Sequence, residues 1–346
     1  MRSGILACLV AALLFGASTP LAKVLLSDVE PFTLAGLLYL GAAVGAALFG
    51  LRGGSATLRR DPGQRARLAG AVVLGGALAP VLLLLGLRAA PAASVSLWLN
   101  AEVVATALLA AAFFREHMGR RAWLAAVLVV VAGILLALPD GAASARAGLF
   151  VALACVCWGL DNNLTAVLGG FTPAQITLTK GLVAGTFNLM LGLALGQRLP
   201  APAIVGAALA LGAVSYGVSI VLYITGAQQL GASRSQLLFA TGPFFGMAIA
   251  WAVLRESVQP AQLLAVPAMA AGLLLLLTGR HEHEHTHEAV THTHRHHHDD
   301  GHHGHADLPG HVGPVRAWHT HVHTHAGQRH GHAHVSDLHH RHEHHG

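Results

Sequence analysis

The stretch AWLAAVLVVVAGILLALP, from Ala122 to Pro139, contains no charged side chain. As a helix that rises about 1.5 Å per residue, it reaches across most of the ~30 Å hydrocarbon layer of a bilayer. Comparable apolar runs recur through the first 279 residues, separated by proline, glycine and charged clusters. Because lipid offers no partner for an open backbone, each run is predicted to be a helix. The sequence therefore predicts an all-α, polytopic membrane protein.

Ten membrane spans are predicted from these runs. Their ranges are 4–26, 32–51, 68–87, 93–114, 122–139, 148–168, 174–196, 203–224, 235–254 and 261–279. Composition agrees, since only 11% of the residues are charged, against roughly 25% in a soluble domain. The first run also resembles a signal peptide, but residues 21–26 continue it without interruption, so we expect it to remain as a span.

The Lys and Arg residues between the spans set the expected orientation. With a cytoplasmic N-terminus, the loops on that side hold ten of these residues before the tail, and the opposite loops hold four. Cytoplasmic loops carry such an excess in bacterial inner-membrane proteins. The N-terminus and the tail after the tenth span are therefore predicted to be cytoplasmic. Nucleic-acid binding is not expected, because the basic residues lie in short loops without interleaved aromatic residues.

The two halves of the apolar region resemble each other. REHM (115–118) follows the fourth span and RESV (255–258) follows the ninth, 140 positions later. AGILLAL (132–138) likewise resembles AGLLLLL (271–277). Five spans per copy is an odd number, so the second copy is predicted to be inverted in the membrane, an arrangement found in alternating-access carriers. The predicted parts are a first repeat at 1–139, a second repeat at 140–279 and a tail at 280–346.

Four motifs carry a resemblance to a known family. They are FGASTPLAK (Phe15–Lys23), PFTLAGLLYL (Pro31–Leu40), WGLDNN (Trp158–Asn163) and ATGPFFGMAIAWAVLRES (Ala240–Ser257). In this order they resemble the EamA-type carriers of the drug/metabolite transporter superfamily. The resemblance covers residues 4–279 and does not extend to the tail. It implies two EamA-like units in a bacterial inner-membrane protein that moves small solutes, often outward.

The first repeat departs from this pattern in two places. Val103 stands where the second repeat has Pro243, so the span at 93–114 is expected to lack the break that a proline introduces. Leu38 stands where the second repeat has Lys180, at a position where the resemblance implies a basic residue.

Ionisable residues inside the spans mark the candidate site, because each costs about 2.5–3.5 kcal/mol to insert on biological scales. Helical spacing places Trp98 on the face of Glu102, and Trp158 and Asn162 on the face of Asp161. Packing of the two repeats is predicted to bring these faces around one cavity near the membrane midplane. The predicted substrate or coupling residues are Glu102, Asp161, Lys180, Asn162, Trp98, Trp158 and Gln236.

Other interpretations of the polar residues stay open. The carboxylates and Lys180 could form purely structural ion pairs, and Lys23 could anchor its span at the membrane surface. Asn100, Asn163 and Asn188 are predicted to make interhelical hydrogen bonds. Glu116 and Glu256, each beside an arginine at a helix end, are interpreted as caps or gate contacts.

No catalytic motif is found, so we expect a protein that is not an enzyme and requires no cofactor. The sequence shows no nucleophile elbow, phosphate-binding loop or HExxH pair in a usable context. Cys8, Cys155 and Cys157 lie inside apolar runs and are interpreted as small packing residues. Formation of a homodimer is left open.

The tail differs from the rest of the chain in composition. It holds 25 of the 26 histidines, and His-x-His steps recur with few apolar residues between them. This composition predicts disorder. Because neutral imidazole is a good ligand for Zn, Ni, Co and Cu, the tail is predicted to bind transition metal with little selectivity. The predicted ligands are His281, His283, His285, His287, His292, His294, His296, His297, His298, His319, His321, His323 and His325.

Three functions are compatible with these features. The favoured one is a secondary transporter of a small organic solute whose cytoplasmic tail binds metal. The alternatives are an exporter of Zn, Ni or Co fed by the tail, and a membrane-tethered metal buffer or sensor. Against the exporter, the spans contain no histidine. The tail could also act as a pH-dependent polycation or be a tolerated extension. The expected partners are the lipid bilayer, the small-molecule substrate and divalent metal ions.

Overall fold

The computed structural model describes residues 2–50, 62–114, 118–138, 141–166, 168, 171–230, 232–277, 281–287, 290–296, 319–325 and 328–334. The chain divides into two compact units, a helical bundle that ends at Gly279 and a unit formed from the tail. Each unit is described by itself.

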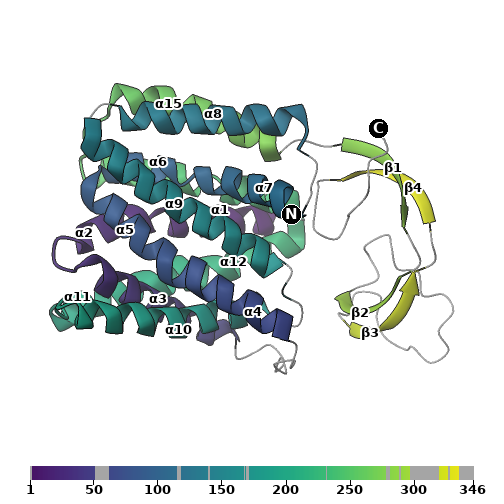
Figure 1. Ribbon diagram of the computed structural model, residues 1–346, viewed down its shortest axis with the longest axis horizontal. Helices are drawn as coiled ribbons and strands as arrows, with labels where there is room; N and C mark the ends of the chain where they lie inside the picture. The colour runs from purple at the N-terminus through teal and green to yellow at the C-terminus, as the bar shows by residue number, and fades with distance from the viewer. Residues whose placement is uncertain are drawn as a thin grey trace. The chain divides into compact units, whose positions relative to one another are not determined.

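Within the described residues the bundle is entirely helical (Figure 1). Its helices are α1 (Arg2–Gly16), α2 (Ser18–Leu25), α3 (Pro31–Gly50), α4 (Pro62–Ala71), η1 (Val72–Leu78), α5 (Ala79–Ala89), α6 (Ala92–Trp98), α7 (Ala101–Phe114), α8 (Arg120–Ala137), α9 (Gly141–Ala166), α10 (Pro173–Ala194), α11 (Pro202–Gly212), η2 (Ala213–Val218), α12 (Ser219–Leu230), α13 (Ala232–Phe239), α14 (Gly242–Ala252) and α15 (Pro260–Leu277). The segments η1 and η2 are π-helical and lie inside longer α-helical spans.

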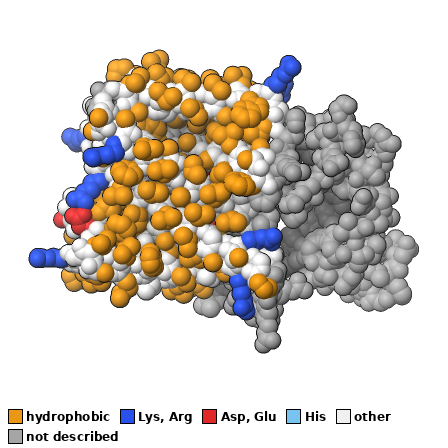
Figure 2. Space-filling model, in the orientation of Figure 1, with side chains coloured by type: hydrophobic (Ala, Val, Ile, Leu, Met, Phe, Trp, Pro, Cys, Tyr) orange, Lys and Arg blue, Asp and Glu red, His pale blue; other side chains and the backbone are white. Residues whose placement is uncertain are grey.

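Each predicted span corresponds to a helical segment. Nine helical stretches in the described residues are long and apolar enough to cross a membrane. The remaining predicted span, 235–254, consists of the shorter helices α13 and α14, which are separated at Ala240–Thr241. Apolar side chains cover the visible side of the bundle, and Lys and Arg side chains lie toward its two ends (Figure 2). This distribution is the one expected of a bundle whose sides contact lipid.

The two halves pack as the predicted inverted pair. Two helices pack against their own counterparts in the other half, namely α3 against α10 and α8 against α15, and α6 of the fourth span packs against α14 of the ninth, which is the counterpart of the fourth. In addition α1 packs against α12, and the counterpart pair, α9 and α5, packs in the same way. A contact pattern that repeats between counterparts is what a pseudo-twofold axis between two repeats produces.

Glycine permits the close crossing of α3 and α10. A Cβ atom on Gly36 would lie 2.6 Å from Leu189 N, and one on Gly181 would lie 2.6 Å from Tyr39 O. No larger residue fits at these positions without moving a helix backbone, which is why small residues are common where membrane helices cross. The crossing fixes α10, which carries Lys180, against the first repeat.

The expectation of an unbroken fourth span was wrong. The span consists of α6 and α7, which are separated at Leu99–Asn100, at the repeat position that corresponds to the break between α13 and α14. The break does not need a proline at position 103. Asn100 Nδ2 donates to Leu97 O at 3.0 Å, and such a local side-chain bond competes with the hydrogen bonds of a continuous helix.

The described part of the tail forms two antiparallel ribbons. β1 (His281–His287) pairs with β4 (Gln328–His334), and β2 (Val290–His296) pairs with β3 (His319–His325). These strands differ from the predicted disorder, and the reason lies in the sequence: His-x-His steps interleaved with threonine and valine have the two-residue period of a strand. An isolated two-stranded ribbon is marginally stable in water, so we expect the ribbons to exchange with open chain.

Candidate functional site

The carboxylate of Glu102 lies in the first turn of α7, directly after the break in the fourth span. Its Oε1 accepts a hydrogen bond from Asn162 Nδ2 of α9 at 3.0 Å, and the same nitrogen lies 3.2 Å from Thr106 Oγ1. The break therefore places Glu102 in contact with the second repeat.

Asp161 of α9 and Lys180 of α10 form an ion pair. Asp161 is only 3% exposed, and its Oδ1 accepts a hydrogen bond from Thr165 Oγ1 at 3.0 Å. A carboxylate buried to this extent requires both an opposite charge and hydrogen bonds. The Lys180 side chain is 17% exposed, so a small molecule that reaches the pair meets the lysine first.

The π-helical segment η1 lies beside this ion pair. Tyr39 Oη and Trp158 Nε1 both donate to the carbonyl oxygen of Gly75, the second at 3.1 Å. A Cβ atom on Gly75 would lie 2.0 Å from Asp161 Oδ2, so the helix approaches the carboxylate through a position without a side chain. Such π-helical turns are frequent at functional sites. η1, Gly75 and Tyr39 were not predicted from the sequence, because no residue pattern marks a π-helical turn.

The second repeat has a π-helical segment at the equivalent place. η2 lies in the eighth span, the counterpart of the third, and Tyr216 in η2 stands 141 positions after Gly75. The ring centroids of Tyr216 and Tyr39 are 6.2 Å apart. The two π-helical segments are therefore connected through this pair of tyrosines.

Two asparagines hold the helices that carry the site. Asn163 Nδ2 donates to Thr106 O at 3.1 Å and joins α9 to α7. Asn188 Nδ2 donates to Ala77 O at 3.1 Å and joins α10 to η1. Both bonds are interhelical, as predicted, and they fix α9 and α10 relative to the first repeat.

We define the polar cluster as Glu102, Asp161, Asn162, Thr165 and Lys180. Glu102 belongs to the first repeat and the other members belong to the second. We call the face at which α1 begins the inner face, and the face that carries the α5–α6 turn the outer face. The cluster lies toward the inner face, because Asp161 is close to the end of α9 and Lys180 is in the first half of α10. Asn162 is the exposed member of the cluster.

Gln236 lies in a row of aromatic contacts, and its described hydrogen bond is not to the polar cluster. Tyr223 Oη donates to Gln236 Oε1 at 2.6 Å. Ring contacts then connect, in order, Tyr223, Phe239, Phe15, Tyr216 and Tyr39, with centroids 4.8, 5.2, 5.8 and 6.2 Å apart. This aromatic row ends at Tyr39, beside the polar cluster.

Trp98 is not brought together with Glu102. The break at Leu99–Asn100 separates the two residues, and Trp98 Nε1 donates to Gly133 O of α8 at 2.9 Å. The Trp98 side chain is only 5% exposed and also lies against α9, where a Cβ on Gly148 would be 3.2 Å from its ring. The described contacts of Trp98 are those of a packing residue.

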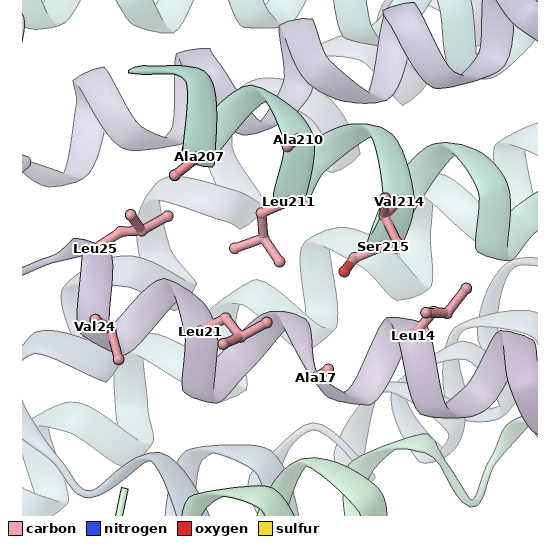
Figure 3. Close-up of a pocket in the computed structure, with 10 residues that line it drawn as sticks. All are labelled: Leu14, Ala17, Leu21, Val24, Leu25, Ala207, Ala210, Leu211, Val214 and Ser215. Atoms are coloured by element: carbon pink, nitrogen blue, oxygen red, sulfur yellow. The ribbon is translucent and has the colours of Figure 1, made fainter. Parts of the chain in front are cut away.

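A cavity of about 420 Å³ lies between α1–α2 and α11–η2, away from the polar cluster (Figure 3). Its lining is apolar apart from the hydroxyl of Ser215. Three of its residues, Leu21, Val24 and Val214, are among the exposed apolar side chains of the bundle. The cavity therefore offers no counter-charge to a polar solute, and we do not assign the solute site to it.

The predicted metal ligands of the tail are described only in part. His297 and His298 lie outside the described residues, and the other predicted ligands lie on β1, β2 and β3, of which only the backbone is described. In the strand register His283 is opposite His332, and His294 is opposite His321. Among the side chains that the structure describes, no three His, Cys, Asp or Glu residues are grouped so that they could hold a metal ion.

Comparison with known proteins agrees with this architecture. Residues 2–138 and 145–278 each match the model of the EamA-like transporter family. An uncharacterized transporter from Methanothermobacter thermautotrophicus is 29% identical over 296 residues, which are 79% of this chain and 85% of the relative. A crystal structure at 18% identity superposes with a TM-score of 0.58 and covers 78% of this chain and 94% of that chain. This last likeness concerns the fold alone.

Proposed function

The chain belongs to the EamA-like transporter family, and from this premise we propose that it is a secondary transporter that moves a small organic solute by alternating access. The orientation with both termini in the cytoplasm of a bacterial cell is part of the proposal and follows from the Lys and Arg distribution. Two inverted repeats that exchange inner and outer openings around one site would supply the transport cycle.

The polar cluster is the observation that carries this proposal. It combines Glu102 of the first repeat with Asp161 and Lys180 of the second, next to a broken helix and a π-helical turn. In carriers built from inverted repeats, substrate sites lie between the repeats and use such discontinuous helices. A rotation of one repeat against the other would change the surroundings of every charge in the cluster.

The charges of the cluster favour a solute that contains a protonated amine. Two carboxylates and one ammonium group leave one negative charge, and Glu102 lies close enough to interact electrostatically with both members of the ion pair. The rings of Tyr39 and Trp158 border the cluster through Gly75, and aromatic rings attract cations. An amine that displaced Lys180 from Asp161 would leave the lysine in need of another anion. A carboxylate on the same solute, or Glu102, could meet that need.

The histidine-rich tail is proposed to bind transition metal on the cytoplasmic side. Its many imidazoles support this role, and the pairing of histidine opposite histidine in both ribbons brings ligands of the right type together along the chain. Metal export by the core has less support, because the polar cluster contains carboxylates, an amide, a hydroxyl and an ammonium group, which are not the ligands that Zn, Ni or Co prefer.

The proposal is tested by counterflow in proteoliposomes that contain the purified full-length protein. The panel consists of labelled amino acids, primary amines, dicarboxylates, and zinc, nickel and cobalt ions. We expect saturable counterflow of at least one amine-containing solute, and we expect it to be lost in Glu102→Gln. Counterflow of dicarboxylates or metal ions only, or of no member of the panel, would overturn the assignment of an amine-containing substrate.

A further inference from the structure

On the outer face, a carboxylate of the second repeat holds the first repeat. Glu256 Oε1 accepts a hydrogen bond from Ala92 N at 2.7 Å, and Glu256 Oε2 accepts one from Ala93 N at 2.9 Å. These amides begin α6 and follow the α5–α6 turn, so they have no partner inside their own helix. Each oxygen of the carboxylate thus binds one free amide across the interface between the repeats.

The local backbone holds Glu256 in this position. Helix α14 ends at Ala252, and Arg255 adopts the left-handed conformation with a φ of 54°. Non-glycine residues adopt this conformation at a cost, and such residues cluster where function constrains the chain. Glu256 N then donates to Ala250 O at 3.3 Å, which closes the turn and directs Glu256 back toward α6.

A buried glutamine makes a second connection at the same place. Gln262 of α15 is 1% exposed and its Nε2 donates to Ser94 Oγ of α6 at 3.0 Å. Its Oε1 accepts hydrogen bonds from Trp251 Nε1 at 3.0 Å and from Gln259 N at 3.1 Å. The first turn of α6 is therefore bound twice by the second repeat, once by Glu256 between α14 and α15 and once by Gln262 in the first turn of α15.

Lys23 strengthens the same turn from the first repeat. Its Nζ donates to Leu87 O and Ala90 O at the end of α5, at 2.6 and 3.0 Å. The two residues that bind the α5–α6 turn have opposite charges and interact electrostatically. Lys23 binds the carbonyl oxygens at the end of α5, and Glu256 binds the amides at the start of α6. The positive charge next to the turn favours retention of the Glu256 carboxylate there.

Glu116 is the residue of the first repeat that corresponds to Glu256, 140 positions earlier, and it lies outside the described residues.

We propose that Glu256 is a gate residue that closes the outer face of the transporter by binding the first amides of a half-helix in the other repeat. The proposal rests on the alternating-access function above. The bonds from Ala92 and Ala93 to Glu256 hold the two repeats together on the outer face, and opening of that face breaks them. Because Lys23 binds the same turn, it supports the state that is closed outside.

The test measures the accessibility of the outer half of the bundle and needs no substrate. Thr19 lies in α2 on the outer side of its span and is 2% exposed. Thr19→Cys is made in a full-length chain in which the three native cysteines are replaced by alanine. A membrane-impermeant maleimide is then added to the outer side of intact cells. We expect Glu256→Gln to raise the labelling rate at least about ten-fold, because charge-assisted hydrogen bonds to the two amides are weakened.

Glu30→Gln is the matched control. Glu30 forms an ion pair with Arg88 on the same outer face, but both residues belong to the first repeat, so its loss should not change the labelling rate. Thermal unfolding in detergent verifies that each variant is folded, and Glu256→Asp serves in place of Glu256→Gln if the latter is not. Labelling at the parental rate in the folded Glu256 variant, or an equal increase in Glu30→Gln, would overturn the proposal. These outcomes do not depend on which solute is transported, so they are separate from a failure of the proposed function.

Discussion

Asn162 of the second repeat donates a hydrogen bond to Glu102 of the first repeat, at 3.0 Å and across 60 positions of sequence. The bond joins two helices that belong to different halves of the pseudo-symmetric bundle. Any motion of one repeat against the other must therefore break this bond or move both residues together. Glu102 is in this way both a member of the polar cluster and a contact between the moving parts.

The charge of Glu102, rather than its hydrogen bond, is expected to matter for transport. In Glu102→Gln the amide oxygen can still accept the bond from Asn162, so the melting temperature should change by no more than about 2 °C. Transport of an amine-containing solute should fall at least about ten-fold, because the anionic partner is lost. Counterflow and thermal unfolding of the same preparations check both statements.

Thr106→Val is a matched control for this variant. It removes the bond from Thr106 Oγ1 to Glu102 O, 2.8 Å long, and the bond from Asn162 Nδ2 to Thr106 Oγ1, but leaves the charge unchanged. We expect a clearly smaller effect on transport than in Glu102→Gln, because the anionic group is retained. A Glu102→Gln protein that transports at the parental rate would remove Glu102 from the substrate site.

The ion pair of Asp161 and Lys180 is expected to show strong coupling. Lys180→Met leaves a carboxylate that is 3% exposed without its counter-charge, and removal of one partner from a buried pair costs about 3–5 kcal/mol. The double variant Asp161→Asn/Lys180→Met removes both charges and should regain most of this stability, while transport stays absent. Thermal unfolding of the two single variants and the double variant measures the coupling. Additive effects in this cycle would show that the two residues do not interact.

The positions of the membrane helices were predictable because the physics of insertion acts on composition alone. An apolar run of sufficient length must become a helix in lipid, and Pro31, Pro173, Pro202 and Pro260 each mark a helix start that the sequence displays. The inverted repeat followed from an odd number of spans. The carboxylates and Lys180 could also be selected, since a charge in an apolar run is costly wherever the helix points.

The local geometry of the site was less predictable. The prediction that Trp98 and Glu102 share one helix face assumed a continuous helix. The break at Leu99–Asn100 instead places Trp98 against α8. That break arises from the Asn100 side chain, whereas proline is the signal that is usually sought. The π-helical segments depend on packing between helices, so Gly75 and Tyr39 could not be chosen from sequence.

Transport is expected to be impaired when Gly75 gains even a methyl group. In Gly75→Ala the new methyl group would lie 2.0 Å from Asp161 Oδ2, so η1 or the carboxylate must move and transport should fall at least about ten-fold. Gly206→Ala is the matched control, because a Cβ at Gly206 in α11 meets no atom within 4 Å. It should be neutral or stabilise the helix by about 0.5–1 kcal/mol. Equal transport by both variants would argue against a close approach of η1 to the ion pair.

Removal of the tail is expected to separate metal binding from transport. A chain that stops at Gly279 lacks 25 of the 26 histidines, and flexible histidine-rich segments bind divalent transition metals without a preformed site. Equilibrium dialysis with zinc or nickel should show several bound ions per full-length protein and almost none for the shortened chain. Counterflow of the amine-containing solute should be the same for both, because every member of the polar cluster lies before residue 279. If the shortened chain instead lost export of metal from loaded cells, and Glu102→Gln lost it too, the core itself would be the metal carrier and the tail its supply.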